Sequence, residues 1–174
     1  MALTVSRPEL LVDGEDHLFR QVIHDALGFS ARLQEIRNRL GETIGLSGPA
    51  YSVLIAIDHL SQHGEVGVSR VSDHLHLSGA FVTMEVNKLV KAGLVAKAPD
   101  LVDGRRVLLS VTDKGTELLN ELTVTQCPVN DTIFAGLAAE QFQALAEIIA
   151  SLVSGTEEAL ALLRLKAEQR RRRA

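Results

Sequence analysis

The residues best suited to chemistry lie within residues 77–112, where polar and basic side chains recur at the spacing of a helix. At about 100° per residue, Val82, Val86 and Leu89 share one face of this helix and should turn toward a core. The outward positions carry polar, small or flexible side chains: Ser78, Ala80, Thr83, Met84, Asn87, Lys88 and Lys91. Such side chains contact base edges and phosphates, so the pattern is typical of a helix that enters the major groove of DNA.

A basic turn follows this helix. Two apolar, β-prone runs, Leu94-Val95 and 107–111, predict a short hairpin. The turn formers between them are Pro99, Asp100, Asp103 and Gly104. The basic candidates on the hairpin are Lys97, Arg105 and Arg106. An arginine at a hairpin tip can enter a narrow minor groove, and Asp103 could pair with Arg105 to hold it there.

The outward side chains differ in what they could recognise. The residues expected to hold phosphates or the minor groove are Lys88, Lys91 and Arg105. Asn87 could bridge an adenine with two hydrogen bonds, whereas Ala80 and Met84 could touch thymine methyl groups. Ser78 and Thr83 would also face base edges, and Ser78 can cap the helix that Gly93 ends.

The charge distribution agrees with a DNA-binding segment in an otherwise acidic chain. The net charge is −4, but residues 61–114 hold seven Lys/Arg against six Asp/Glu, and the rest holds eleven against sixteen. The segment is therefore at +1 and the remainder at −5. Binding to DNA should be confined to one face.

Composition narrows the class of protein. The 174 residues are 46% hydrophobic and 23% charged, which is typical of a globular chain. No run approaches the ~20 apolar residues of a membrane span, no secretory signal is visible, and the single cysteine excludes an internal disulfide framework. We expect a cytoplasmic protein with no membrane partner.

Catalytic, cofactor and metal motifs are not evident. The sequence contains no phosphate-binding glycine loop, no nucleophile elbow and no CxxC pair, so we expect no cofactor and no enzyme activity. His59 and His63 could share a metal ion, but a third ligand is not apparent, and we expect no metal site. Cys127 could be a redox sensor, although no neighbouring basic residue would activate it.

Helices are expected before and after the predicted DNA-binding segment. Ser47 can cap a helix from about Gly48 to Gln62, with Pro49 in its first turn. Ser69 can cap a short helix from Arg70 to Leu75, and 64–68 could form a minor strand. Apolar residues at helical spacing predict further helices over about 16–40, from 113 to about 125 before Pro128, and from about 138 to the tail.

Residues 45–122 resemble the MarR family of winged-helix regulators. The carriers are Gly45-Leu46-Ser47 with Pro49 and Tyr51, the run 71–78, Lys91-Ala92-Gly93-Leu94-Val95, Pro99-Asp100 through Asp103-Gly104-Arg105-Arg106, and 108–115. Four positions depart from the family's usual pattern: Met84 stands where an arginine is common, Gly79 and Ala80 where larger polar residues are common, and His76 where a glycine is common. Histidine tolerates a left-handed backbone better than most residues, so the turn can survive.

The resemblance implies a mainly α fold with a small β-wing, in which a winged helix-turn-helix is flanked by N- and C-terminal dimerisation helices. It divides the chain into an N-terminal arm and dimerisation helix (1–46), a DNA-binding lobe (47–114) and C-terminal helices that complete the dimerisation lobe (115–174). It implies a homodimer on a pseudo-palindromic operator.

The resemblance also implies a small-molecule effector, often a phenolic or aromatic carboxylate, between the dimer helices and the DNA-binding lobe. The polar candidates for that crevice are His17, Arg20, His24, Tyr51 and His59. The sequence favours a repressor released by such an effector. A winged-helix module that binds only proteins, and a metal- or redox-responsive regulator, remain as alternatives.

Overall fold

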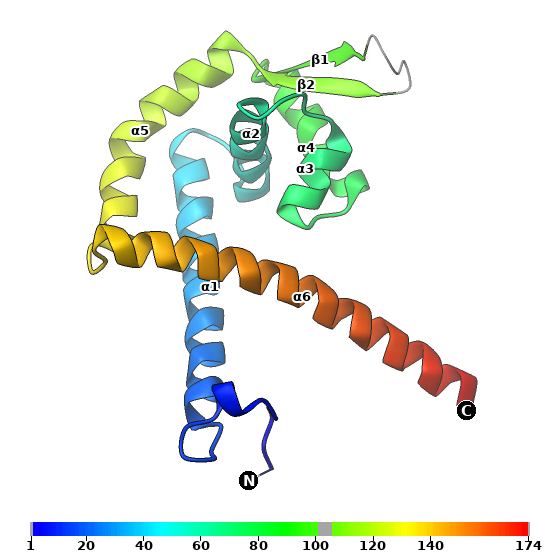
Figure 1. The fold of residues 1–174 in the computed structure, drawn as a ribbon. Coiled ribbons are helices and arrows are strands. Elements are labelled where there is room, and N and C mark those ends of the chain that lie inside the picture. The colour runs from blue at the N-terminus through cyan, green and yellow to red at the C-terminus, as the bar shows by residue number, and fades with distance from the viewer. Residues whose placement is uncertain (1, 101–105, 174) are drawn as a thin grey trace. The chain divides into compact units, whose positions relative to one another are not determined.

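A computed structural model describes residues 2–100 and 106–173 (Figure 1). The described chain is mostly helical with one two-stranded antiparallel sheet, which confirms the expected fold class. The contacts divide it into two compact units, Met1–Gln126 and Cys127–Ala174. The first unit contains a short 3-10 turn (Pro8–Leu10), helices α1 to α4, strands β1 and β2, and most of α5.

Helix α2 (Gly48–Ser61) is the centre of the first unit. It packs against α1 (His17–Thr43), α3 (Val68–Leu75), α4 (Gly79–Lys91) and β2. Its Val53, Leu54 and Ile57 are fully buried, since apolar residues lie on several of its faces. The expected start is confirmed, because the Ser47 hydroxyl accepts a hydrogen bond from the Ala50 amide and Pro49 lies in the first turn.

The turn between α3 and α4 depends on one unusual backbone conformation. His76 ends α3 with φ 53° in the left-handed region, which histidine was expected to tolerate. Ser78 then caps α4 by accepting from the Phe81 amide, as predicted. Gly93 follows α4 with φ 74°, and the Leu94 amide closes the helix end on the Leu89 carbonyl.

The predicted start of α3 was wrong. The helix begins at Val68 after Gly67, and no side chain caps it. The Leu109 amide donates to the Val66 carbonyl, and Gly67 forms an isolated bridge with Leu108. This pairing ends at Gly67, so the chain turns into the helix there and not at Ser69. The expected minor strand over 64–68 is reduced to this bridge.

Strands β1 (Val95–Pro99) and β2 (Val107–Val111) form the wing. Their register pairs Val95 with Val111 and Pro99 with Val107. Strand β1 therefore extends beyond the predicted Leu94-Val95 run, because all five of its residues find partners on β2. Asp103 and Arg105, both assigned to the hairpin tip, lie outside the described residues.

Helix α1 joins the first unit through its C-terminal part. Leu40 and Tyr51 are buried with Leu122 of α5, and Ile36 packs against them. Nearer the start of α1, Asp16 accepts hydrogen bonds from the Thr4 amide and hydroxyl and from Arg20. These bonds hold the pKa of the Asp16 carboxyl well below its usual range and attach the N-terminal segment to α1.

Helix α5 (Asp113–Phe134) runs through Pro128, so the helix end expected before this proline was wrong. A proline removes one helical N–H but does not always end a helix. The second unit continues with α6 (Ala139–Arg173), and the Phe134 and Phe142 rings pack edge to face within it. Among the described residues no single helix is both long and apolar enough to cross a membrane, although α1 and α2 together, bent by 89°, reach that length and composition.

Candidate nucleic-acid interface and ligand cavity

The outer face of α4 is exposed as the angle count predicted. Val82 and Val86 are fully buried, whereas Met84 between them is 46% exposed. We use the name outer face for the exposed residues Ala80, Thr83, Met84, Asn87 and Lys91. The helix thus offers a mixed polar and apolar surface of the kind that contacts base edges. Thr83 and Ser78 also bond to the backbone of α4, through the Gly79 carbonyl and the Phe81 amide.

Lys88 is held by an acid that the sequence analysis did not single out. Its Nζ lies 2.7 Å from Oε1 of Glu85, a residue only 2% exposed. The other carboxylate oxygen, Oε2, is buried with no hydrogen-bond partner among the described residues. The sequence could have predicted that Glu85 is buried, because position 85 lies three residues after Val82 and four before Leu89 on the inward face.

Lys97 joins the wing to the outer face. Its Nζ donates to Asn87 Oδ1 at 2.6 Å, across ten residues of sequence. Both residues are exposed, and Lys97 is paired with Leu109 in the strand register. The wing and α4 therefore present their polar groups as one surface.

Arg106 stands at the base of the wing. Its guanidinium is 3.6 Å from the nearly buried carboxylate of Asp100, and the Asp100 amide donates to the Arg106 carbonyl. A hollow of about 260 Å³ opens beside it, lined also by Ser69 and Arg70. Arg70, which the sequence analysis did not place in the interface, donates to the carbonyls of Glu65 and His63. Two arginines at one hollow give this edge a positive character.

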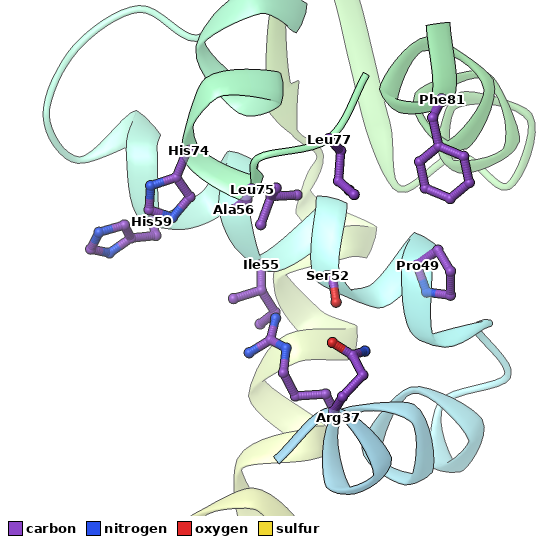
Figure 2. Close-up of a pocket in the computed structure, with 11 residues that line it drawn as sticks. Arg37, Pro49, Ser52, Ile55, Ala56, His59, His74, Leu75, Leu77 and Phe81 are labelled. Atoms are coloured by element: carbon purple, nitrogen blue, oxygen red, sulfur yellow. The ribbon is translucent and has the colours of Figure 1, made fainter. Parts of the chain in front are cut away.

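A larger cavity of about 500 Å³ lies between α1, α2 and the helix-turn-helix (Figure 2). Its lining comes from four helices and one turn: Gln34, Arg37, Pro49, Ser52, Ile55, Ala56, His59, His74, Leu75, Leu77 and Phe81. In Figure 2, Arg37 extends from α1, while Leu77 and Phe81 point into the cavity from the opposite side. Most of the lining is apolar, with a few polar groups, which is typical of a small-molecule site.

Two histidines meet at one end of this cavity. The rings of His59 and His74 have centroids 5.6 Å apart, and the His63 ring lies 5.5 Å from that of His59. Burial lowers the pKa of His74, and the nearby His59, His76 and Arg70 lower it further. The structure thus brings His74 beside the His59 and His63 pair. Among the residues that the structure describes, no three side chains are placed to hold a metal ion together.

The structure scatters the effector candidates expected from the sequence. Of the five, His59 lines the cavity and the other four do not. Tyr51 is buried in the core with Leu40, where burial raises the pKa of its hydroxyl. Arg20 bonds to Asp16 at the start of α1, and the exposed His17 and His24 lie on the same part of that helix. The cavity instead takes its polar groups from elements that only folding brings together.

Cys127, the candidate redox sensor, is exposed on α5.

Known proteins resemble this chain over the same elements. A profile described as the MarR family matches residues 44–106. The chain is 24% identical over 131 residues to the HTH-type transcriptional repressor MdtR of Bacillus subtilis (strain 168), covering 75% of this chain and 84% of that protein. It is 28% identical over 114 residues to the HTH-type transcriptional repressor IacR of Pseudomonas putida, covering 66% of each.

The fold is shared with a solved regulator. The PcaV transcriptional regulator from Streptomyces coelicolor, in complex with its natural ligand, superposes with a TM-score of 0.57 at 27% identity, over 74% of this chain and 91% of that one. The segment that the profile matches includes α2 to α4 and strand β1, the elements that carry the outer face and Lys97. The chain is therefore similar to the MarR family over residues 44–106, and to two transcriptional repressors and one solved transcriptional regulator over a larger part of its length.

Proposed function

We propose that this chain is a homodimeric, cytoplasmic repressor that leaves its DNA operator when a small aromatic carboxylate binds. The observation that carries the proposal is the position of the cavity. Its lining includes Phe81 in the first turn of α4 and Leu77 in the turn before it. A ligand there contacts the recognition helix from behind, so its binding energy can favour a different position of that helix.

Exposed apolar side chains support the homodimer. On α1 they include Leu18, Val22, Ile23 and Leu27, and on α6 they include Ile148, Ile149, Leu152, Leu160 and Leu163. Apolar patches of this extent usually mark an interface. A two-fold contact buries the same patch on both copies and sets two recognition helices about 34 Å apart, which requires a pseudo-palindromic operator.

The domain roles follow from this arrangement. Residues 1–46 serve as arm and dimerisation helix, 47–114 as the DNA-binding lobe, and 115–174 complete the dimerisation lobe. In the DNA-binding lobe the outer face enters the major groove. The side chains of Lys88, Lys91, Arg105 and Arg106 then hold phosphates or the minor groove, with Asp103 beside Arg105.

The polar groups of the cavity favour an aromatic carboxylate as effector. Arg37 can bind a carboxylate with two parallel hydrogen bonds, and His59 and His74 can hydrogen-bond a phenolic hydroxyl. Ile55, Leu75 and Phe81 supply apolar surface for a ring. Arg37 also lies over the Tyr51 ring, 5.3 Å from its centroid, and this contact limits the directions in which the guanidinium can point.

A ligand screen tests the proposal. Substituted benzoates and hydroxybenzoates should raise the melting temperature of the protein and release it from its operator in a mobility-shift assay. Arg37→Met should abolish both effects while leaving operator binding intact. Arg32→Met, which changes an exposed arginine on the same helix outside the cavity, should behave as wild type.

Two outcomes would contradict parts of the proposal. A protein that binds no duplex DNA would be the interaction module that the sequence left open. A protein that binds DNA but responds to these compounds equally with and without Arg37 would have its effector site elsewhere. Release by a divalent metal or by oxidation alone would favour the metal- or redox-responsive alternative.

A further inference from the structure

We propose that Asn87 and Lys97 act as one donor-only unit that selects guanine in each half-site. The inference rests on the proposed function, because it assumes that the outer face of α4 enters the major groove. It begins from the contact between Lys97 Nζ and Asn87 Oδ1 at 2.6 Å.

The chemistry of lysine settles the orientation of this amide. A lysine ammonium carries three N–H donors and no acceptor, so the Asn87 atom that faces it must be the carbonyl oxygen. The amide NH₂ of Asn87 therefore points away from Lys97. The pair then offers the two N–H groups of that amide and the remaining N–H groups of the ammonium.

This set of donors matches one base better than the others. Guanine shows two adjacent acceptors in the major groove, N7 and O6. Adenine shows one acceptor and one donor, and a bidentate contact to adenine needs the Asn87 carbonyl. Lys97 already donates to one lone pair of that carbonyl, and its positive charge beside the oxygen disfavours the approach of the adenine N6 donor. Cytosine shows a donor, and thymine shows a single acceptor beside its methyl group.

The surrounding structure holds the pair in place. Asn87 lies on α4 beside the fully buried Val86, which anchors the helix to the core. Lys97 lies on β1 opposite Leu109, a buried residue of β2. Two elements with their own core contacts thus hold the backbone at each end of the hydrogen bond. A contact fixed before binding loses less conformational freedom on the DNA.

The two lysines of α4 itself, Lys88 and Lys91, do not form such a unit. Lys88 is held by the buried carboxylate of Glu85, which keeps its charge close to a negative group. Lys91 is exposed on the outer face one turn beyond Asn87. Lys91 therefore serves as the matched control for Lys97, because both are exposed lysines on the same surface.

Selection from a pool of random duplexes with the full-length protein tests the inference. The wild type should enrich guanine at one position of each half-site. Replacing that guanine with 7-deazaguanine, which lacks only the N7 acceptor, should weaken binding about tenfold, within the range for one base contact. Replacing it with hypoxanthine removes only a minor-groove amino group and should leave affinity unchanged.

Variants of Asn87 and Lys97 then test whether this pair causes the preference for guanine. Asn87→Ala should make binding insensitive to 7-deazaguanine. Lys97→Met frees the Asn87 carbonyl and should shift the selected base from guanine to adenine. Lys91→Met should weaken binding to all operators alike and keep the guanine. Because Asn87, Lys91 and Lys97 are exposed, the melting temperature of each variant should stay at the wild-type value.

Adenine at this position in the wild-type selection would overturn the inference while leaving the proposed function intact. So would a Lys97→Met variant that weakens every operator equally, as Lys91→Met does. Failure of the wild type to enrich any duplex would overturn the proposed function together with the inference.

Discussion

At the scale of single residues, an exposed methionine is the least expected feature of the outer face. Met84 is 46% exposed between two fully buried valines, so water covers an apolar side chain in the free protein. A thymine methyl group in the major groove would cover it, and the flexible thioether can adjust to an imperfect fit. Asn87 and Met84 are three residues apart and would face neighbouring base pairs.

Met84→Ala should lower operator affinity by about 1 kcal/mol, in the range for one lost base contact. It should also reduce the preference for thymine over uracil, which lacks only the methyl group. Binding to operators with either base measures this preference. Val86→Ala is the contrasting variant, because it empties buried space and should lower the free energy of unfolding by about 2 kcal/mol. A destabilised Met84→Ala protein with wild-type base preference would contradict the contact.

At the scale of elements, the local signals for helix ends were reliable where nothing distant competed with them. Ser47 and Ser78 cap α2 and α4 as predicted, because a cap needs only a side chain and an amide three residues on. The prediction that Ser69 caps α3 was wrong, because β2 pairs with Val66 and Gly67 and the helix starts directly after them. The prediction that the helix ends before Pro128 was also wrong, since α5 continues through this proline to Phe134.

The packing of α3 on α2 should depend on pH through His74. Its pKa is lowered, chiefly by burial and then by His59, His76 and Arg70, so the folded state disfavours the protonated ring. Below the ordinary histidine value of 6.5 the unfolded chain binds the proton first, and the free energy of unfolding should fall as pH falls. Denaturant unfolding between pH 8 and pH 5 measures the slope.

His74→Gln removes the titrating ring and should flatten that part of the pH dependence. At pH 8 both proteins carry an uncharged residue at this position, so the difference from the wild type at pH 8 gives the packing cost alone. The same slope in the variant and the wild type would show that His74 does not control the pH response.

At the scale of the whole molecule, the apolar stripe on α6 should be what joins two copies. Leu152 is 60% exposed on that stripe. Leu152→Glu would bury a charge without a partner in the dimer and should give a monomer with much weaker operator binding. Light scattering at micromolar concentration measures the mass.

Ser154→Glu is the matched control, because residue 154 is exposed about 200° around the same helix from residue 152. It should remain a dimer. If Leu152→Glu also keeps the wild-type mass, or changes only the melting temperature, the stripe packs within one copy and lies outside the interface.

The sequence alone determined the recognition helix, its caps and the wing, because these depend on residues close together in the chain. The 100° spacing placed Val82 and Val86 inward and Met84 outward, and the backbone geometry of a helix leaves little choice in this. The MarR resemblance and the expected fold class came from the order of the same local motifs. The profile match over 44–106 supports the resemblance, and the helices with their two-stranded sheet confirm the fold class.

Only the tertiary structure decided which side chains meet. The hydrogen bond from Lys97 to Asn87 joins a strand to a helix, and the cavity draws Arg37, His74 and Phe81 from three helices. Tyr51, which looked suited to a ligand, became core because α1 and α5 close over it. Such contacts depend on how segments distant in sequence pack around α2. The period of one helix shows which face turns inward, but not which residue of another element lies against it.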